Sequence, residues 1–121
     1  MKLISVTGES VPPGKGGSPS DTFDRSIAIW EENGKQKTVT VTYVRYFGKV
    51  LAERGIYDQD AESIPVSHLV AVLFEEKHPG IKENRHYINN IDEFAELFAD
   101  FSLAKWKERY PGLTGVTQAK A

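Results

Sequence analysis

The sequence predicts an α+β fold, in which an antiparallel sheet of about three strands is built around a hairpin at residues 25–43. Two or three helices should pack on one face of this sheet. The hairpin is indicated by two strand-like runs that flank Asn33-Gly34, a typical turn dipeptide. The helices are indicated by apolar residues that recur at intervals of three and four in the second half. A chain of 121 residues without cysteine is expected to form a single domain, 1–121, whose core needs no disulfide.

The pairing register of the hairpin decides which side chains face the core. A two-residue turn would pair Ile29 with Thr38 and mix apolar and polar residues on each face. A three-residue loop at 32–34 pairs Ile27 with Val39 instead. We predict the three-residue loop, because it gathers five apolar side chains on one face: Ile27, Ile29, Val39, Val41 and Tyr43.

Before the hairpin, residues 2–7 alternate in polarity and predict a further strand. Residues 8–20 contain three prolines and four glycines, a composition typical of a long mobile loop. The Gly14-Lys15 pair in this segment lacks the spacing and the following helix of a phosphate-binding loop. The tail at 115–121 has few residues that could pack, so we expect it to be frayed.

After the hairpin, local signals predict several short elements. Residues 44–54 fit a helix that stops at Gly55, although a longer strand competes. Residues 57–63 should form an acidic loop. The expected elements that follow are a helix from Pro65 to His78, whose apolar run at 69–74 also suits a buried strand, a short strand at 85–88, and a helix capped by Asn90.

The apolar pattern of the last helical region changes phase after Asp100. Phe94, Leu97, Phe98 and Phe101 form one stripe, whereas Leu103, Trp106 and Tyr110 fall on roughly the opposite side of a continuous helix. Either the helix breaks near 100–102, or it is apolar on two sides and needs a second partner.

No motif for catalysis or for a cofactor is present. The three histidines, His68, His78 and His86, do not have the spacing of a zinc-binding helix, so we expect no metal and no cofactor. The longest apolar run, residues 69–74, is too short to span a bilayer. These observations predict a soluble, cytoplasmic protein without a membrane partner.

Charge is distributed unevenly along the chain. Residues 57–100 carry ten acids and three bases, whereas residues 101–121 carry four bases and one acid. The basic segment is rich in Trp, Tyr and Arg, which are enriched at binding hot spots. Candidate binding residues are therefore Lys105, Trp106, Lys107, Arg109 and Tyr110, together with Trp30 from the hairpin. The competing interpretation is that Trp106 and Tyr110 belong to the core.

The function that this pattern favours is a small non-catalytic interaction module, an adaptor, regulator or inhibitor that occupies the surface of a partner protein. The alternative is a nucleic-acid-binding domain that uses the basic, aromatic C-terminal helix and the hairpin face. A small enzyme without a recognisable motif is the third hypothesis. The protein partner is unidentified, and a second copy of this chain, forming a homodimer, is one candidate.

Overall fold

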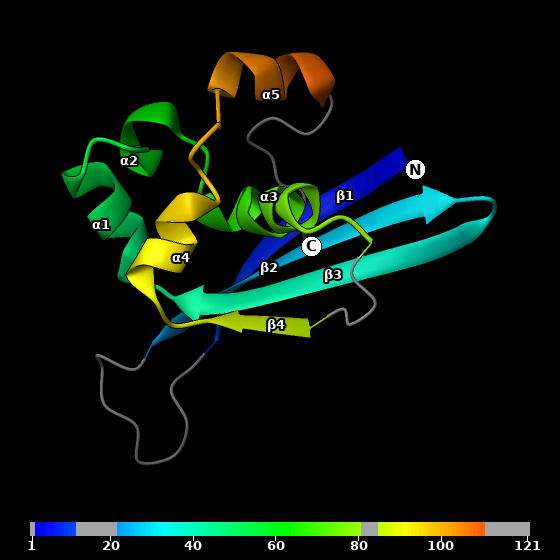
Figure 1. Ribbon diagram of the computed structural model, residues 1–121, viewed down its shortest axis with the longest axis horizontal. Coiled ribbons are helices and arrows are strands. Elements are labelled where there is room, and N and C mark those ends of the chain that lie inside the picture. Colours follow the sequence, from blue (N-terminus) through cyan, green and yellow to red (C-terminus); the bar gives the residue numbers. More distant parts are fainter. Residues whose placement is uncertain (1, 12–21, 81–84, 111–121) are drawn as a thin grey trace.

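The computed structural model describes residues 2–11, 22–80 and 85–110, which form an α+β fold (Figure 1). The sheet has four strands in the order β1-β2-β3-β4. The first three strands are antiparallel, and β4 pairs with β3 in parallel. The strands are β1 (Lys2–Val11), β2 (Phe23–Glu32), β3 (Lys35–Val44) and β4 (Arg85–Ile88).

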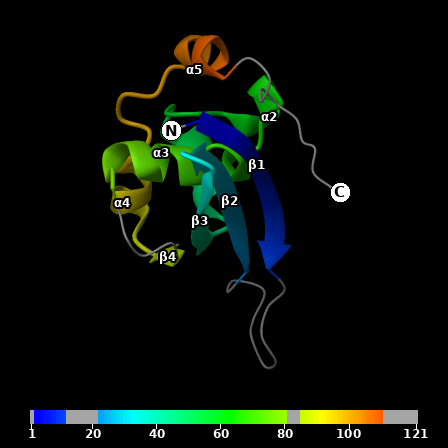
Figure 2. The same cartoon turned by 90° about the vertical axis from the view of Figure 1, so that its right-hand side faces the viewer.

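All described helices lie on one side of this sheet (Figure 2). They are α1 (Phe47–Glu53), α2 (Gln59–Glu62), the 3-10 helix η2 (Val66–His68), α3 (Val70–Lys77), α4 (Ile91–Glu96) and α5 (Leu103–Arg109). Helix α3 and η2 pack directly on the sheet, and α3 is buried over most of its length. This explains the uninterrupted apolar run at 69–74, because a helix covered on all sides has no polar face.

The predicted hairpin register is wrong. The structure has a two-residue turn, in which Asn33 and Gly34 have φ angles of 55° and 79°, and Ile29 pairs with Thr38. Positive φ at both central residues is typical of a type I′ turn, whose twist matches that of the strands it connects. The turn geometry therefore outweighed the preference for collecting the isoleucines on one face.

The core face of β2 consists of two small residues, Ser26 and Ala28, and one large residue, Trp30. Ser26 and Ala28 are fully buried, and the Ser26 hydroxyl accepts a hydrogen bond from the amide of Ala71 at 2.8 Å. Small side chains let η2 and α3 approach the strand closely, which isoleucines would prevent. Opposite them, β3 contributes three buried side chains: Val39, Val41 and Tyr43.

Strand β1 is longer than predicted. Residues 8–11 continue the strand and pair with β2, so the prediction of a mobile loop at 8–20 is wrong for these four residues. The rest of that loop and the tail at 115–121 lie outside the described residues. Gly8 is required where it stands, because a Cβ at this position would collide with the side chain of Ser67 in η2.

The helix predictions are confirmed in outline. Helix α1 lies within 44–54 and is followed by Gly55, whose φ is 73°. The segment predicted as a helix from Pro65 begins with η2 and continues as α3, and strand β4 occupies 85–88. The acidic stretch at 57–63 is not only a loop, because α2 forms there with Asp58 as its N-cap.

The phase change after Asp100 results from a break in the helix. Helix α4 begins after Asn90, whose side chain accepts from the amides of Asp92 and Glu93. Helix α5 begins after Ser102, whose hydroxyl accepts from the amide of Lys105. Because the chain changes direction between the two helices, both apolar stripes reach the same core.

Candidate protein-interaction surface

The five predicted binding residues of the C-terminal segment have different environments in the structure. Lys105, Lys107 and Arg109 are exposed, and Tyr110 is half-buried. Trp106 is only 3% exposed and belongs to the core. The competing interpretation of Trp106 is therefore the one that the structure favours, and a partner can contact this segment mainly through its charged side chains.

Trp30 lies apart from the other predicted residues. It is 4% exposed and faces the helices from strand β2. Its indole ring is thus part of the sheet–helix core and does not present a stacking surface in this conformation.

Helix α3, the segment between α4 and α5, and α5 itself enclose a cleft of about 270 Å³. Apolar side chains and a ring of charged and polar side chains line it together. The apolar residues are Leu73, Leu97, Phe101 and Trp106, and the polar ones are Glu76, Lys77, Asp100, Ser102, Lys105 and Arg109. An apolar centre with a polar rim is the usual anatomy of a protein interface.

One wall of the cleft is fixed by a three-residue network between α3 and the end of α5. Arg109 pairs with the Glu76 carboxylate at 2.5 Å, and the Tyr110 hydroxyl donates to the same carboxylate at 2.9 Å. Arg109 also donates to the Tyr110 oxygen at 3.0 Å. Burial and the hydrogen bond to Glu76 raise the pKa of Tyr110 to about 12. Partial burial opposes the charge of Arg109, but Glu76 outweighs this effect and raises the pKa of Arg109.

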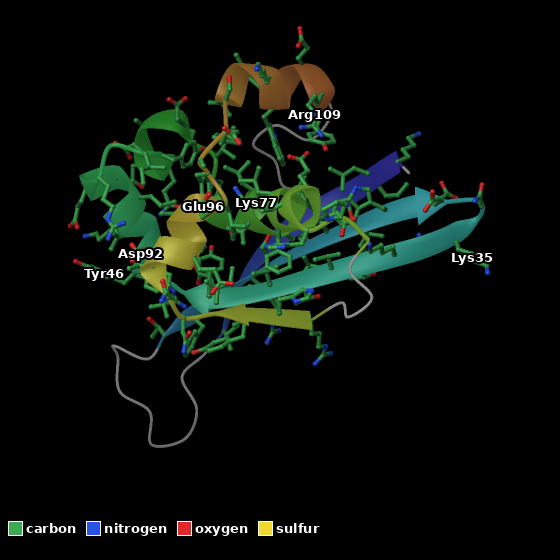
Figure 3. The ribbon with its side chains drawn as sticks, in the orientation of Figure 1. Lys35, Tyr46, Lys77, Asp92, Glu96 and Arg109 are labelled. Atoms are coloured by element: carbon green, nitrogen blue, oxygen red, sulfur yellow. The ribbon has the colours of Figure 1, made fainter. Side chains whose placement is uncertain are left out.

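Lys77, at the end of α3, joins this helix to α4 (Figure 3). Its ammonium group donates at 3.2 Å to both the carbonyl and the carboxylate of Glu96 in α4. Lys105 and Lys107 form no ion pair with any residue that the structure describes. A partner could therefore engage these two ammonium groups without breaking a described contact, and the same holds for the exposed carboxylate of Asp100, which lines the cleft.

Trp106 anchors α5 to the rest of the molecule. Its ring packs against Phe101 and, edge to face, against Tyr110 with centroids 4.8 Å apart. The indole N–H is covered and has no acceptor among the described residues. A buried donor without a partner costs about 1–3 kcal/mol, so the packing of α5 is less favourable than the burial of Trp106 alone suggests.

The histidines do not form a cluster. His68 is half-buried in η2, and its Nδ1 atom is covered without a partner in the described part of the chain. The rings of His78 and His86 both pack against Phe74, with centroids 4.8 and 4.4 Å away. Within residues 2–11, 22–80 and 85–110, no three histidine or acidic side chains converge as metal ligands, and no helix is long and apolar enough to cross a membrane.

A second surface escaped the sequence analysis because it depends on the hairpin register. The sheet face opposite the helices displays Ile27 and Ile29, two of the five side chains that the wrong register assigned to the core. At one end, Phe23 and the 54%-exposed Tyr87 lie 5.4 Å apart across β3. The sequence could have predicted this face only if Asn33-Gly34 had been interpreted as a two-residue turn, because that turn sets the register.

Comparisons with protein-family models, with curated proteins and with solved structures give no match to this chain.

Proposed function

We propose that this protein is a small non-catalytic interaction module that binds a partner protein at the cleft between α3 and α5. The observation that supports this proposal is the apolar floor of the cleft within a charged rim, on the helix that carries the predicted binding residues. A regulator or inhibitor that acts by occupying a partner's surface needs such a site and no catalytic group.

The size of the cleft favours a side chain over a free small molecule. Pockets for drug-sized ligands usually measure about 300–1,000 Å³, whereas this one measures about 270 Å³ and is open to solvent. One large apolar side chain of a partner, such as leucine or phenylalanine, would fill much of it. Burying such a side chain contributes about 1.5–3 kcal/mol, which suits an anchor within a larger contact.

The charges of helix α5 favour an acidic partner segment. Helix α5 carries Lys105, Lys107 and Arg109 against a single acid, Glu108. Arg109 is engaged by Glu76, which leaves the two lysines to meet carboxylates of the partner. The proposed ligand is thus a protein segment with an apolar residue flanked by Asp or Glu.

The groups of the cleft are engaged in holding helices together, which supports a binding role over a catalytic one. Glu76 joins Arg109 and Tyr110, and Lys77 joins Glu96. Freeing any of them for proton transfer would break a contact between helices.

Partner capture and site-specific crosslinking test this proposal. A photoreactive amino acid is placed at Lys105, and the matched control carries it at Lys49 on the exposed side of α1. The expected result is a protein crosslink from position 105 only. Equal crosslinking from both positions would contradict the assignment of the surface.

Charge reversal measures the contribution of the lysines once the partner is captured. Lys105→Glu combined with Lys107→Glu should weaken binding at least tenfold, whereas Lys49→Glu should change it less than twofold. Surface substitutions of this kind usually alter stability by no more than about 0.5 kcal/mol, so the melting temperatures should stay close to that of the wild type.

Salt dependence distinguishes the nucleic-acid alternative, which the three bases of α5 favour. Phosphate contacts release counterions, so binding of single-stranded DNA or RNA would fall steeply with salt. A protein interface with an apolar anchor should weaken only modestly between 50 and 200 mM salt, by an estimated factor of about ten or less. A steep decrease of binding affinity with salt, together with competition by a single-stranded oligonucleotide, would favour nucleic acid over a protein as the partner.

A further inference from the structure

We infer that two copies of this chain associate through the sheet face opposite the helices, and that Arg85 of each copy meets Glu9 of the other. This inference concerns a different surface from the α3–α5 cleft and does not depend on the proposed function.

The face in question is formed by alternate residues of all four strands. None of the described helices covers it, because η2 and α3 pack on the other side (Figure 2). Its apolar members are Val11, Phe23, Ile27, Ile29, Val44 and Tyr87. Threonines fill the middle of the face, so methyl groups and hydroxyls alternate with the apolar side chains.

The face has two different ends, which restricts how a second copy can pack on it. The end with Phe23, Val44 and Tyr87 is apolar and aromatic. The other end, near the hairpin turn, carries Lys2 and Glu31. A twofold axis across the strands would place the aromatic end on the charged end. A twofold axis along the strands, between β2 and β3, places like ends together and is therefore the arrangement that buries apolar surface against apolar surface.

The same axis makes the charges complementary. It places β1 of one copy opposite β4 of the other. Residues at the same height along the strands in one copy face residues at that same height in the other copy. Arg85 is level with Thr40, Ile27 and Thr7 in the sheet register, and Glu9 lies two residues from Thr7 on the same face. Arg85 of one copy therefore comes within side-chain reach of Glu9 of the other copy, twice in the dimer.

Arg85 is available for this contact. It is exposed and forms no ion pair with a residue that the structure describes. It lies beside a shallow hollow of about 210 Å³ that Arg25, Ile27, Thr40 and Thr42 also line. Arg25 already holds Glu9 at 2.5 Å within the same chain, so in the dimer the Glu9 carboxylate would lie between two guanidinium groups.

The area of the face predicts a weak dimer. Three ten-residue strands and the short β4, with a rise of about 3.3 Å per residue and a spacing of about 4.8 Å, give a footprint of roughly 500 Å². A standard interface buries about 800 Å² on each partner. Association should therefore depend on concentration, with a sandwich of two sheets as its core.

Sedimentation equilibrium and light scattering from about 5 μM to 1 mM test the inference. The wild type should change from monomer to dimer in this range. Ile27→Lys, at the centre of the face, should weaken association at least tenfold, whereas Lys49→Glu on α1 should change it less than twofold. A protein that stays monomeric to 1 mM, or a dimer that Ile27→Lys leaves intact, overturns the inference.

A charge swap tests the arrangement of the two copies. Arg85→Glu should weaken association severalfold because it brings two acids together, and the double variant Arg85→Glu/Glu9→Arg should recover most of the loss. Melting temperatures at low concentration show whether the monomer of each variant remains folded. Folded double and single variants with equally weak association would exclude this twofold axis and overturn the assignment of the Arg85–Glu9 contact.

Discussion

At the scale of single residues, burial decides what each side chain can do. Trp106 was a candidate for contact with a partner, but its ring is held between Phe101 and Tyr110 and is 3% exposed. The lysines on either side of it remain in solvent. Within one turn of α5, the aromatic residue therefore fixes the helix to the core, whereas the charged residues form the surface.

Trp106→Ala should therefore act mainly on stability. Removing a buried tryptophan costs about 3–5 kcal/mol, from lost burial and from the cavity that remains. Chemical denaturation should show this loss, with Lys107→Ala as a control that changes stability by no more than about 0.5 kcal/mol. An equally small effect of Trp106→Ala would show that the ring is not buried in solution.

His68 should make folding stability depend on pH. Burial lowers the pKa of its imidazole below the usual 6.5, so below that pH the unfolded chain takes up a proton more readily than the folded one. The stabilisation is complete above 6.5 and is lost as the pH falls through the depressed folded value. NMR titration of the imidazole protons should give a midpoint below 6.5, and His68→Gln should reduce the loss of stability between pH 7.5 and 5. A midpoint at or above 6.5 would contradict this prediction.

At the scale of elements, close packing between β1 and η2 depends on the absence of a side chain at Gly8. A Cβ there would lie 2.6 Å from the Cβ of Ser67 and still nearer its hydroxyl. The hydroxyl of Ser67 also bonds to the Tyr43 phenol, whose pKa burial raises well above its usual value. Strand, 3-10 helix and core tyrosine are thus joined at one point.

Gly8→Ala should destabilise the fold by about 1–3 kcal/mol, because the added methyl group forces β1 and η2 apart. Ser67→Gly opens the space again, so the double variant should lose less stability than the sum of the two single variants. Thermal or chemical unfolding of all four proteins gives this coupling. Strict additivity would mean that β1 and η2 do not approach each other as the structure shows.

At the scale of the whole molecule, the sheet and the helical layer are connected by polar contacts as well as by the apolar core. Lys37 on β3 reaches the buried carboxylate of Glu75 on α3, with nitrogen–oxygen distances of 3.0 and 3.1 Å. Glu75 also accepts from the amide of Gly80, just beyond the helix. One carboxylate therefore joins the sheet, α3 and the turn that follows α3.

Lys37→Met should cost roughly 3 kcal/mol, because it leaves the Glu75 charge buried without its cation. Replacing both partners, Lys37→Met with Glu75→Leu, should cost clearly less than the single variant, since no unpaired charge then remains. Equilibrium unfolding in denaturant measures both values. A double variant that is less stable than Lys37→Met would show that the ion pair contributes more than it costs to desolvate.

The sequence by itself determined the local features of this protein. The hairpin at Asn33-Gly34, the Asn90 cap, the stop at Gly55 and the strand at 85–88 all depend on neighbouring residues, and each appears in the structure where its signal lies, although the turn has two residues and not the predicted three. The α+β class follows from these elements. Their physical causes, backbone conformation and hydrogen bonding within a few residues, are encoded over the same short distances.

Only the tertiary structure decided which faces are buried. The sequence pattern favoured Ile27 and Ile29 as core residues, but small residues such as Ser26 are needed where α3 approaches the sheet. It also made Trp106 a candidate surface residue, but the helix break at Ser102 turns this side chain towards the core. The parallel pairing of β4 with β3 likewise could not be predicted from the sequence of either strand. Burial depends on how distant layers fit together, so the two candidate interfaces could be located only after those layers were placed.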